Sequence, residues 1–467
     1  AILNRAVTGS NIDFQSLTSA PQLRYTTVYE VEPGKPWVNV RFAVKNITSG
    51  PLEFPSAFAV QLLGLVGLSS SGFTVPVGDI ALFGATSQVF MPGIGFDSRF
   101  GLEESYQRKV DFPAFPGIVT EWVASRGNGA SYGLVVDESD RNFVWQKKKT
   151  YDDGSTPVTR SSILVPFSAS SFLGLFYESA PATLGPGETF ETVKHFVIGS
   201  GDVGSVLDGI LRLRGTPTGR LSGQVLDDVT GLASTGTSVI VYQRLADVDR
   251  VYSQYDVRED GSFGGDLPEG KYGLLVQGDG RPLGSLIPFE IRRGETTPIR
   301  THSTPPGRVV LRVIDADGHP LPAKVTAVGT YGPENVGKLP RRFLFDLQAG
   351  DKFRATDLVD DDPNDASTRQ YIEAIAFTDR GNAELALRPG KYRIVTSRGP
   401  EYDLRETEVT VGPAETRSIT HSLARVVDTT GWIAGDLHIH SKNSIDSSLT
   451  LDERVRSLAA EGVEWAV

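Results

Sequence analysis

Two histidines near the end of the sequence are the residues best suited to chemistry. They lie in the segment Gly435-Asp436-Leu437-His438-Ile439-His440-Ser441. Side chains at positions i and i+2 of a strand point to the same face, so we expect His438 and His440 to converge, with Asp436 on the same face. Neutral imidazole is a common ligand of zinc and related metals, and Asp436 is placed to orient one ring by accepting a hydrogen bond. The spacing predicts a metal site, with a purely structural histidine pair as the alternative.

A strand, a helix and a second strand are expected to hold this segment in place. The apolar residues of 432–439 predict the end of a buried strand. Thr450 and Glu453 form a capping-box pattern that starts a helix, and Gly462 fits the helix end. Residues 463–467 then begin another strand. This order predicts a parallel pair, and in barrels of this kind the active site lies at the C-terminal ends of the strands, where both histidines fall.

Composition limits the classes of partner and chemistry. The formal net charge of −11 argues against nucleic acid as the main partner, because phosphate binding needs a basic surface. The absence of cysteine excludes disulfides, thiolate metal sites and a cysteine nucleophile. No apolar run reaches the roughly 18 residues of a membrane span. The N-terminus has no signal-peptide pattern, so either none existed or it was removed before residue 1.

The rest of the sequence predicts a mainly β protein. It contains 50 Gly and 28 Pro with many Val, Thr and Ser, which is typical of strands joined by turns. Residues 1–215 predict one large β-sandwich domain, because segments with alternating apolar residues, such as 38–44 and 190–198, recur between Pro-Gly turns. A short helix over 203–213 is expected to close this domain.

Two copies of a smaller β-sandwich follow, which we name module 1 (216–304) and module 2 (305–425). Each contains a strand, a turn and a strand, ending in Gly270-Lys271-Tyr272 in module 1 and Gly390-Lys391-Tyr392 in module 2. The turns are farther apart than the module starts, which predicts an insertion at about 332–370 in module 2. The pattern resembles the carboxypeptidase regulatory-like, transthyretin-like modules of exported bacterial proteins, which are immunoglobulin-like sandwiches that act as spacers or docking surfaces.

The segment 199–204 matches the Gly-x-Gly-x-x-Gly pattern of dinucleotide-binding proteins. It follows an expected strand and precedes an expected helix. We reject the cofactor interpretation, because the next strand, 220–226, is already the start of module 1. Nothing nearby supplies further units of a parallel sheet. A glycine-rich turn before a short helix is the preferred interpretation.

The C-terminal segment resembles a known family. The residues that carry the resemblance are Gly431-Trp432, Asp436-Leu437-His438-Ile439-His440-Ser441, Ser444-Ile445-Asp446-Ser447, Arg454-Val455 and Glu461-Gly462-Val463-Glu464. Together they look like the start of the PHP domain, named after the polymerase and histidinol phosphatase superfamily. The CehA/McbA-like metallohydrolases are the most similar branch, and their bacterial members often carry β-domains ahead of the catalytic one. Residues 426–467 are therefore expected to begin a PHP metallohydrolase domain.

The resemblance implies a distorted (β/α)7 barrel that holds two or three divalent metals, which would be zinc, manganese or iron. It implies that His438 and His440 are the first ligand pair and that Asp446 is a further ligand or a neighbouring acid. The remaining ligands and catalytic residues would follow Val467, so this chain alone is expected to be inactive. The expected partner is a C-terminal PHP polypeptide. It would cover the apolar stripe of 451–459, whose exposure costs about 1.5–3 kcal/mol for each Leu or Val.

A complete domain of this kind is expected to be a hydrolase that uses metal-activated water. Its target would be an ester, carbamate, amide or phosphoester bond in a small-molecule or polymeric substrate. Module type and the lack of cysteine favour an exported bacterial protein, in the periplasm, at the cell surface or outside the cell. The alternative is a non-catalytic β-rich scaffold, adhesion or glycan-binding protein in which the PHP segment is an inactive remnant.

Overall fold

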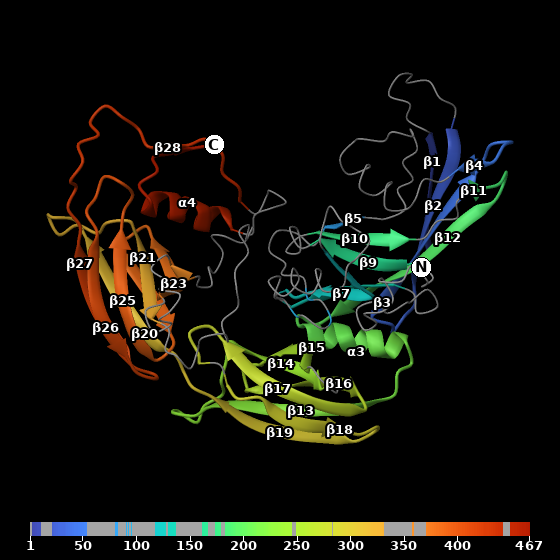
Figure 1. Ribbon diagram of the computed structural model, residues 1–467, viewed down its shortest axis with the longest axis horizontal. Coiled ribbons are helices and arrows are strands. Elements are labelled where there is room, and N and C mark those ends of the chain that lie inside the picture. Colours follow the sequence, from blue (N-terminus) through green and yellow to red (C-terminus); the bar gives the residue numbers. More distant parts are fainter. Residues whose placement is uncertain are drawn as a thin grey trace, which may run out of the picture.

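The protein is mainly β, as predicted, and its parts follow one another along a curve (Figure 1). The N-terminal sheets lie at one end, module 1 in the middle, and module 2 with the C-terminal segment at the other end. The computed structural model describes residues 2–10, 21–53, 80–82, 90, 92, 95, 117–127, 129–136, 161–166, 173–178, 183–244, 249–282, 284–330, 357–358, 370–441 and 449–467. No helix in these ranges is long and apolar enough to cross a membrane.

The described N-terminal part contains two main sheets. A six-stranded antiparallel sheet has the order β1-β2-β3-β12-β8-β7, and a four-stranded antiparallel sheet has the order β5-β10-β9-β6. β4 pairs separately with β11. The bounds are β1 Ile2–Ser10, β2 Pro21–Val31, β3 Trp37–Asn46, β4 Leu52–Glu53, β5 Ile80–Leu82, β6 Gly117–Thr120, β7 Trp122–Ser125, β8 Ser131–Val136, β9 Ser161–Pro166, β10 Leu173–Glu178, β11 Thr183–Leu184 and β12 Thr189–Gly199.

Modules 1 and 2 share one strand order, apart from an additional edge strand, β22, in module 2. Each combines a three-stranded sheet with a larger one: β16-β13-β19 with β15-β14-β17-β18 in module 1, and β24-β20-β27 with β22-β23-β21-β25-β26 in module 2. In both, the first strand pairs antiparallel with one neighbour and parallel with the last strand of the module. The bounds are β13 Thr218–Asp227, β14 Thr237–Arg244, β15 Asp249–Asp256, β16 Ser262–Pro268, β17 Gly270–Gly278, β18 Ile287–Ile291, β19 Thr296–Ser303, β20 Gly307–Ile314, β21 Ala323–Thr330, β22 Asp357–Leu358, β23 Gln370–Thr378, β24 Asn382–Leu387, β25 Gly390–Ser397, β26 Arg405–Val411 and β27 Thr416–Ser422.

The repeated Gly-Lys-Tyr turn has a structural reason. The hydroxyl of Tyr272 donates to the carbonyl of Pro268 at 2.9 Å, and the hydroxyl of Tyr392 donates to the carbonyl of Arg388 at 2.7 Å. Both rings are buried in their modules. A buried phenol needs a hydrogen-bond partner, and here it finds one four residues back, which ties the turn to the new strand. The extra length of module 2 falls between β21 and β23, and most of the predicted insertion, 332–370, lies outside the described residues.

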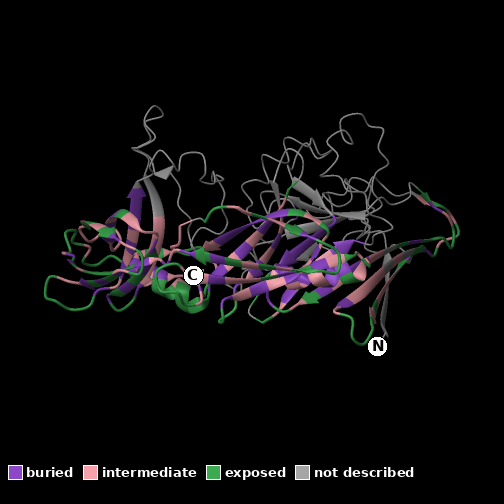
Figure 2. Ribbon diagram, turned by 90° about the horizontal axis from the view of Figure 1, so that it is seen from below, coloured by how far each residue is buried: buried purple, intermediate pink, exposed green. Residues whose placement is uncertain are grey.

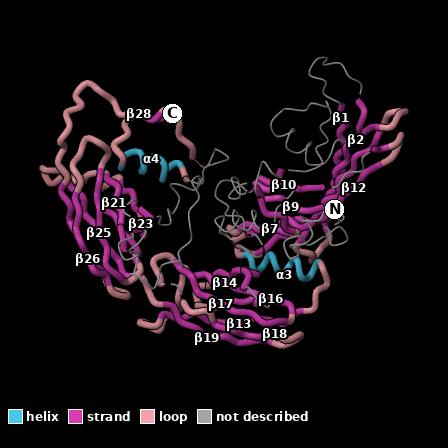
Figure 3. Tube along the Cα trace, viewed as in Figure 1, coloured by secondary structure: helices cyan, strands magenta, loops and turns pink. Residues whose placement is uncertain are grey.

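Helix α3, Val203–Leu213, joins the N-terminal part to module 1 (Figure 3). Its apolar residues recur at helical spacing, and Val206 and Ile210 are buried. They belong to one core cluster with Val197 of β12 and Tyr255 of β15. The core therefore runs from the N-terminal sheets through α3 into module 1, across the expected boundary at residue 215.

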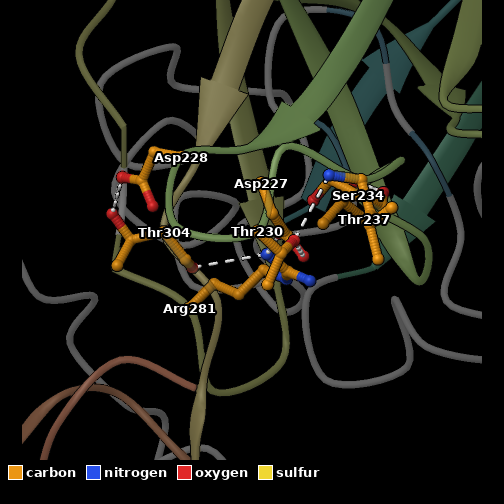
Figure 4. Close-up of polar contacts among 8 residues, drawn as sticks. Asp227, Asp228, Thr230, Ser234, Thr237, Arg281 and Thr304 are labelled. Atoms are coloured by element: carbon orange, nitrogen blue, oxygen red, sulfur yellow. Dashed lines mark hydrogen bonds and ion pairs between the residues drawn. The ribbon is translucent and has the colours of Figure 1, made fainter.

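Polar contacts hold the last residue of module 1, where the chain passes into module 2 (Figure 4). Nη1 of Arg281 donates to Oδ1 of Asp227 at 2.5 Å and to the carbonyl of Thr304 at 3.4 Å. The hydroxyl of Thr304 donates to Oδ2 of Asp228 at 2.6 Å. A Cβ atom at Gly280 would lie 2.7 Å from the carbonyl oxygen of Ala386, so module 1 touches module 2 directly. Module 2 has a separate core cluster of its own.

The C-terminal segment forms strand β28 (Gly435–Asp436), helix α4 (Leu451–Ala460) and strand β29 (Trp465–Ala466). Helix α4 lies on module 2, where it contacts β21 and β23. Most of its surface is exposed, in contrast to the buried strands of the modules (Figure 2). This unit carries the predicted metal ligands.

Candidate metal centre

β28 and β29 form the parallel pair that the sequence predicts. Gly435 is opposite Trp465 and Asp436 opposite Ala466. The ladder continues on both sides, because the N–H of Ile439 donates to the carbonyl of Val467 at 3.0 Å and the N–H of Glu464 donates to the carbonyl of Ala434 at 2.8 Å. Strand, helix and strand therefore follow the βαβ order.

The expectation of a buried strand end is wrong. β28 has only 2 residues. The apolar side chains around it are largely exposed, at 81% for Trp432, 74% for Ile433 and 72% for Leu437. β28 and β29 form a sheet of only two strands, and no second layer among the described residues covers it. Helix α4 does not supply that layer, because it packs on β21 and β23 of module 2. The apolar residues of 432–439 indicated that this segment is buried, but they could not show which part of the protein would cover it.

His438 and His440 converge, as their spacing predicts. Their Nε2 atoms are 2.7 Å apart, and the two rings stack with centroids 4.7 Å apart and planes 20° apart. At this distance one imidazole donates an N–H and the other accepts it. His438 is exposed and His440 is half-buried, so the paired nitrogens are accessible to a dissolved ion.

The pair fits a metal in donor type. Two nitrogens bound to one tetrahedral zinc at 2.0–2.1 Å would be about 3.3 Å apart. A small opening of the ring pair is enough to reach that separation. Two imidazoles fill only two positions, and a catalytic zinc takes at least three protein ligands. The predicted third ligand, Asp446, lies outside the described residues.

Asp436 supports the backbone of the site. Its Oδ1 accepts a hydrogen bond from the N–H of His438 at 3.1 Å. This contact fixes the chain between the two residues. The expected role, in which the Asp436 carboxylate orients an imidazole ring, stays a prediction.

Helix α4 holds the other end of the histidine segment. Thr450 and Glu453 form the predicted capping box, in which Oγ1 of Thr450 accepts from the N–H of Glu453 at 3.2 Å and Oε2 of Glu453 accepts from the N–H of Thr450 at 2.9 Å. The hydrogen bond from the Thr450 side chain is the main cause that lowers the pKa of Glu453. One turn into the helix, Nε of Arg454 donates to the carbonyl of His440 at 2.7 Å. Sequence reasoning missed this arginine, because spacing alone does not show which carbonyl a surface arginine reaches.

The apolar stripe of α4 is exposed at its N-terminal end, as expected. Leu451 is 58% exposed and Val455 is 57% exposed. The buried residues of the helix are Ser457 and Ala460, which lie on the face toward module 2. α4 thus packs through Ser457 and Ala460, while Leu451 and Val455 face away from module 2 and Leu458 is half-buried.

A second group of potential ligands lies in module 2. Asp315, Asp317 and His319 are close enough to hold one ion. They form a tight turn, since Oδ1 of Asp315 accepts from the N–H groups of Asp317 at 2.9 Å and of His319 at 2.8 Å. These bonds, led by the one from His319, lower the pKa of Asp315. The Asp-x-Asp-x-His spacing is visible in the sequence, and its contacts explain it as a turn.

The Gly-x-Gly-x-x-Gly segment at 199–204 also has a structural role. Oδ1 of Asp202 caps α3 by accepting from the N–H of Ser205 at 2.8 Å, so a carboxylate of the chain occupies the place where a phosphate would bind. The strand before it lies in an antiparallel sheet. The last glycine of the motif, Gly204, serves packing, because a Cβ there would lie 2.1 Å from the ring of Tyr255. An adjacent hollow of about 450 Å³ carries charges of both signs, from Arg126, Arg258, Asp202 and Asp256.

Comparisons with known proteins find only distant similarity. No family model matches the chain, and no curated protein matches it. Similar solved structures include GBS52, the minor pilin of Streptococcus agalactiae (16% identity, 45% of this chain and 97% of that chain, TM-score 0.23). Others are a streptococcal ancillary pilin (13%, 65% and 77%, 0.25) and the shaft pilin SpaA of Lactobacillus rhamnosus GG (10%, 45% and 99%, 0.26).

Proposed function

We propose that residues 426–467 are the start of a PHP-type metal-dependent hydrolase domain, and that His438 and His440 are its first metal ligands. The convergence of the two Nε2 atoms, 2.7 Å apart on one side of the chain, is the observation that supports this most strongly. The proposal includes two or three divalent ions, zinc, manganese or iron, held jointly with ligands from other strands of the (β/α)7 barrel, and Asp446 among them.

Each residue of this unit has a definite task in the proposal. His438 and His440 bind metal through Nε2, Asp436 fixes the backbone between them, and Arg454 holds the carbonyl of His440. A bound metal would lower the pKa of its water toward neutrality and polarise a carbonyl or phosphoryl oxygen. The substrate would carry an ester, carbamate, amide or phosphoester bond. Export from a bacterial cell belongs to the same proposal.

A C-terminal PHP polypeptide is part of the proposal as the partner of this unit. The exposed apolar side chains Leu451, Val455 and Trp465 lie on α4 and β29, a helix and a strand that would pack against the other elements of a barrel. Burial of each Leu or Val would contribute about 1.5–3 kcal/mol to that packing. These residues support the proposal because a solvated helix face would carry polar side chains instead.

Metal titration tests the proposal. We expect the protein to bind Zn²⁺ in isothermal titration, and His438→Ala and His440→Ala each to abolish that binding. His319→Ala is the matched control, because it removes an exposed histidine from the acidic turn of module 2 and should leave binding unchanged. Failure of the wild-type protein to bind zinc, manganese or iron would refute the metal site. Loss of binding in His319→Ala alone would move the site to module 2.

One observation favours the alternative of a glycan-binding protein. Tyr29 and Tyr132 of the six-stranded sheet are 42% and 45% exposed, and Tyr132 stacks on Phe196 with ring centroids 5.3 Å apart. Exposed aromatic faces suit stacking on sugar rings. Pull-down with insoluble polysaccharides compares wild type with Tyr29→Ala and Tyr132→Ala. Retention by wild type and its loss in both variants would support this alternative, and equal behaviour of all three proteins would exclude it.

A further inference from the structure

Module 2 contacts the histidine unit through a defined interface. Ser457 and Ala460 of α4 are buried against this module, which the helix contacts at β21 and β23. Nζ of Lys324 pairs with Oε1 of Glu461 at 2.6 Å at the end of the helix. Nε of Arg456 lies 3.6 Å from Oδ1 of Asp379. A module that served only as a spacer would be joined to its neighbour by a linker alone. Module 2 instead packs against helix α4 and pairs with one charged residue in the helix and one at its end.

Arg398 lies at the centre of this interface. Its Nη1 donates to the carbonyl of Pro322 in module 2 at 2.9 Å and to the carbonyl of Ala459 in α4 at 2.8 Å. The last carbonyls of a helix have no partner within the helix and carry partial negative charge, so a guanidinium is well suited to them. The guanidinium is also held over the ring of Tyr402, with Cζ 5.4 Å from its centroid.

The residue after Arg398 shows how close the contact is. Gly399 has φ of +54°, and a Cβ atom there would lie 2.3 Å from the carbonyl oxygen of Glu461. Any side chain at this position would force α4 away from module 2. The backbone of module 2 therefore reaches the end of the helix itself.

The same helix continues to the histidines. Ala459, which Arg398 holds, is near the C-terminal end of α4, and Arg454, which holds the carbonyl of His440, is near its start. The capping box at Thr450 makes the first turn rigid. A continuous series of contacts thus runs from module 2 through Arg398, α4 and Arg454 to His440.

We propose that Arg398 is a positioning residue for the metal site: it locks α4 on module 2 and thereby sets the place of His440 relative to His438. The metal-binding part of this inference rests on the proposed function. Residues that orient ligands without touching the metal typically contribute 10–100-fold to metal affinity. We expect Arg398→Ala to weaken Zn²⁺ binding by at least tenfold and Arg398→Lys, which keeps the positive charge and N–H donors, to lose less.

The experiment measures geometry and affinity separately. The sequence contains no cysteine, so cysteines placed at the exposed positions Asp452 and Glu384 can carry two spin labels. Their distance distribution reports how α4 sits on module 2. We expect it to be narrow in the parent protein and broad with Arg398→Ala. Zn²⁺ affinity is measured by calorimetry without labels.

Two further variants make the test specific. Arg417→Ala is the matched control. Nε of Arg417 donates to the carbonyl of Thr410 at 3.2 Å, a contact within module 2 that involves no residue of α4. We expect this variant to change neither the distance distribution nor the Zn²⁺ affinity. Arg454→Ala should weaken zinc binding and leave the distance distribution narrow. An unchanged distribution with Arg398→Ala, or a broad distribution with full zinc affinity, would overturn the inference. Absence of zinc binding in the wild type would refute the proposed function instead, and the distance measurement would still decide whether Arg398 locks α4.

Discussion

Asp208 offers a quantitative test of the contact between α3 and module 1. It lies on α3, partly buried, and its Oδ1 accepts from the N–H of Asp266 at 2.7 Å. Burial, the largest cause, raises the pKa of Asp208 to about 6 from an ordinary 3.8. The charges of Asp266 and Asp202 act in the same direction, and the Asp266 N–H and the charge of Arg220 act against it. The fold therefore favours the neutral carboxyl group.

The expected pH dependence follows from this direction. Between 3.8 and about 6 the folded protein binds more protons at Asp208 than the unfolded chain does, so stability falls as the pH rises through this window. The pKa difference corresponds to about 3 kcal/mol of unfolding free energy. Asp208→Asn keeps an acceptor oxygen for the Asp266 N–H and never ionises. We expect equal stability of variant and wild type at about pH 3, below both pKa values, and a variant more stable by up to about 3 kcal/mol at about pH 8.

Urea unfolding at a series of pH values measures this difference. Trp37 and Trp122 are buried in the same core cluster as α3, so their fluorescence reports the relevant transition. Glu259→Gln removes an exposed carboxyl from module 1 and controls for the change in net charge. A stability difference between Asp208→Asn and wild type that does not change with pH would refute the reasoning. A variant that is less stable at high pH would refute it as well.

Three further substitutions test other contacts. Arg214→Met leaves Glu121 without its 2.9 Å ion-pair partner in a buried site and should cost about 3–5 kcal/mol in chemical unfolding, whereas Arg212→Met, exposed on the same helix, should cost little. Tyr392→Phe removes the hydroxyl that donates to a backbone carbonyl of module 2. We expect it to lower the free energy of unfolding of module 2 by about 1 kcal/mol and to leave that of module 1 unchanged. Thr450→Ala removes the cap of α4 and should cost about 0.5–2 kcal/mol of local stability, read as faster amide exchange in 451–455 and not in α3.

Local signals in the sequence predicted much of the fold. The alternating segments became strands, the Thr450 capping box became the start of α4, and the Gly-Lys-Tyr turns became matching corners in two modules of the same strand order. The spacing of His438 and His440 was enough to bring their rings together. Each of these depends on neighbouring residues and on backbone geometry alone.

Contacts between distant residues could not be predicted in this way. The stripe of Leu451 and Val455 identified the apolar face of α4, but the helix packs through Ser457 and Ala460, because Arg398 and Lys324 of module 2 hold its end. The core shared by α3 and module 1 was missed for a similar reason. The helix was assigned to the domain before it, and no local pattern shows that Tyr255 packs against Gly204.

The shared core has a consequence for how the chain comes apart. Residues up to about 304 are expected to unfold as one cooperative block, since α3 is common to both of its parts, while module 2, with a separate core, forms a second block. Calorimetry should resolve two transitions. A fragment cut at residue 215 would expose the α3 surface that faces Tyr255. A fragment that ends at Thr304 would keep the shared core whole, because the core clusters of the two blocks have no residue in common, so we expect this fragment to fold by itself when it is expressed alone.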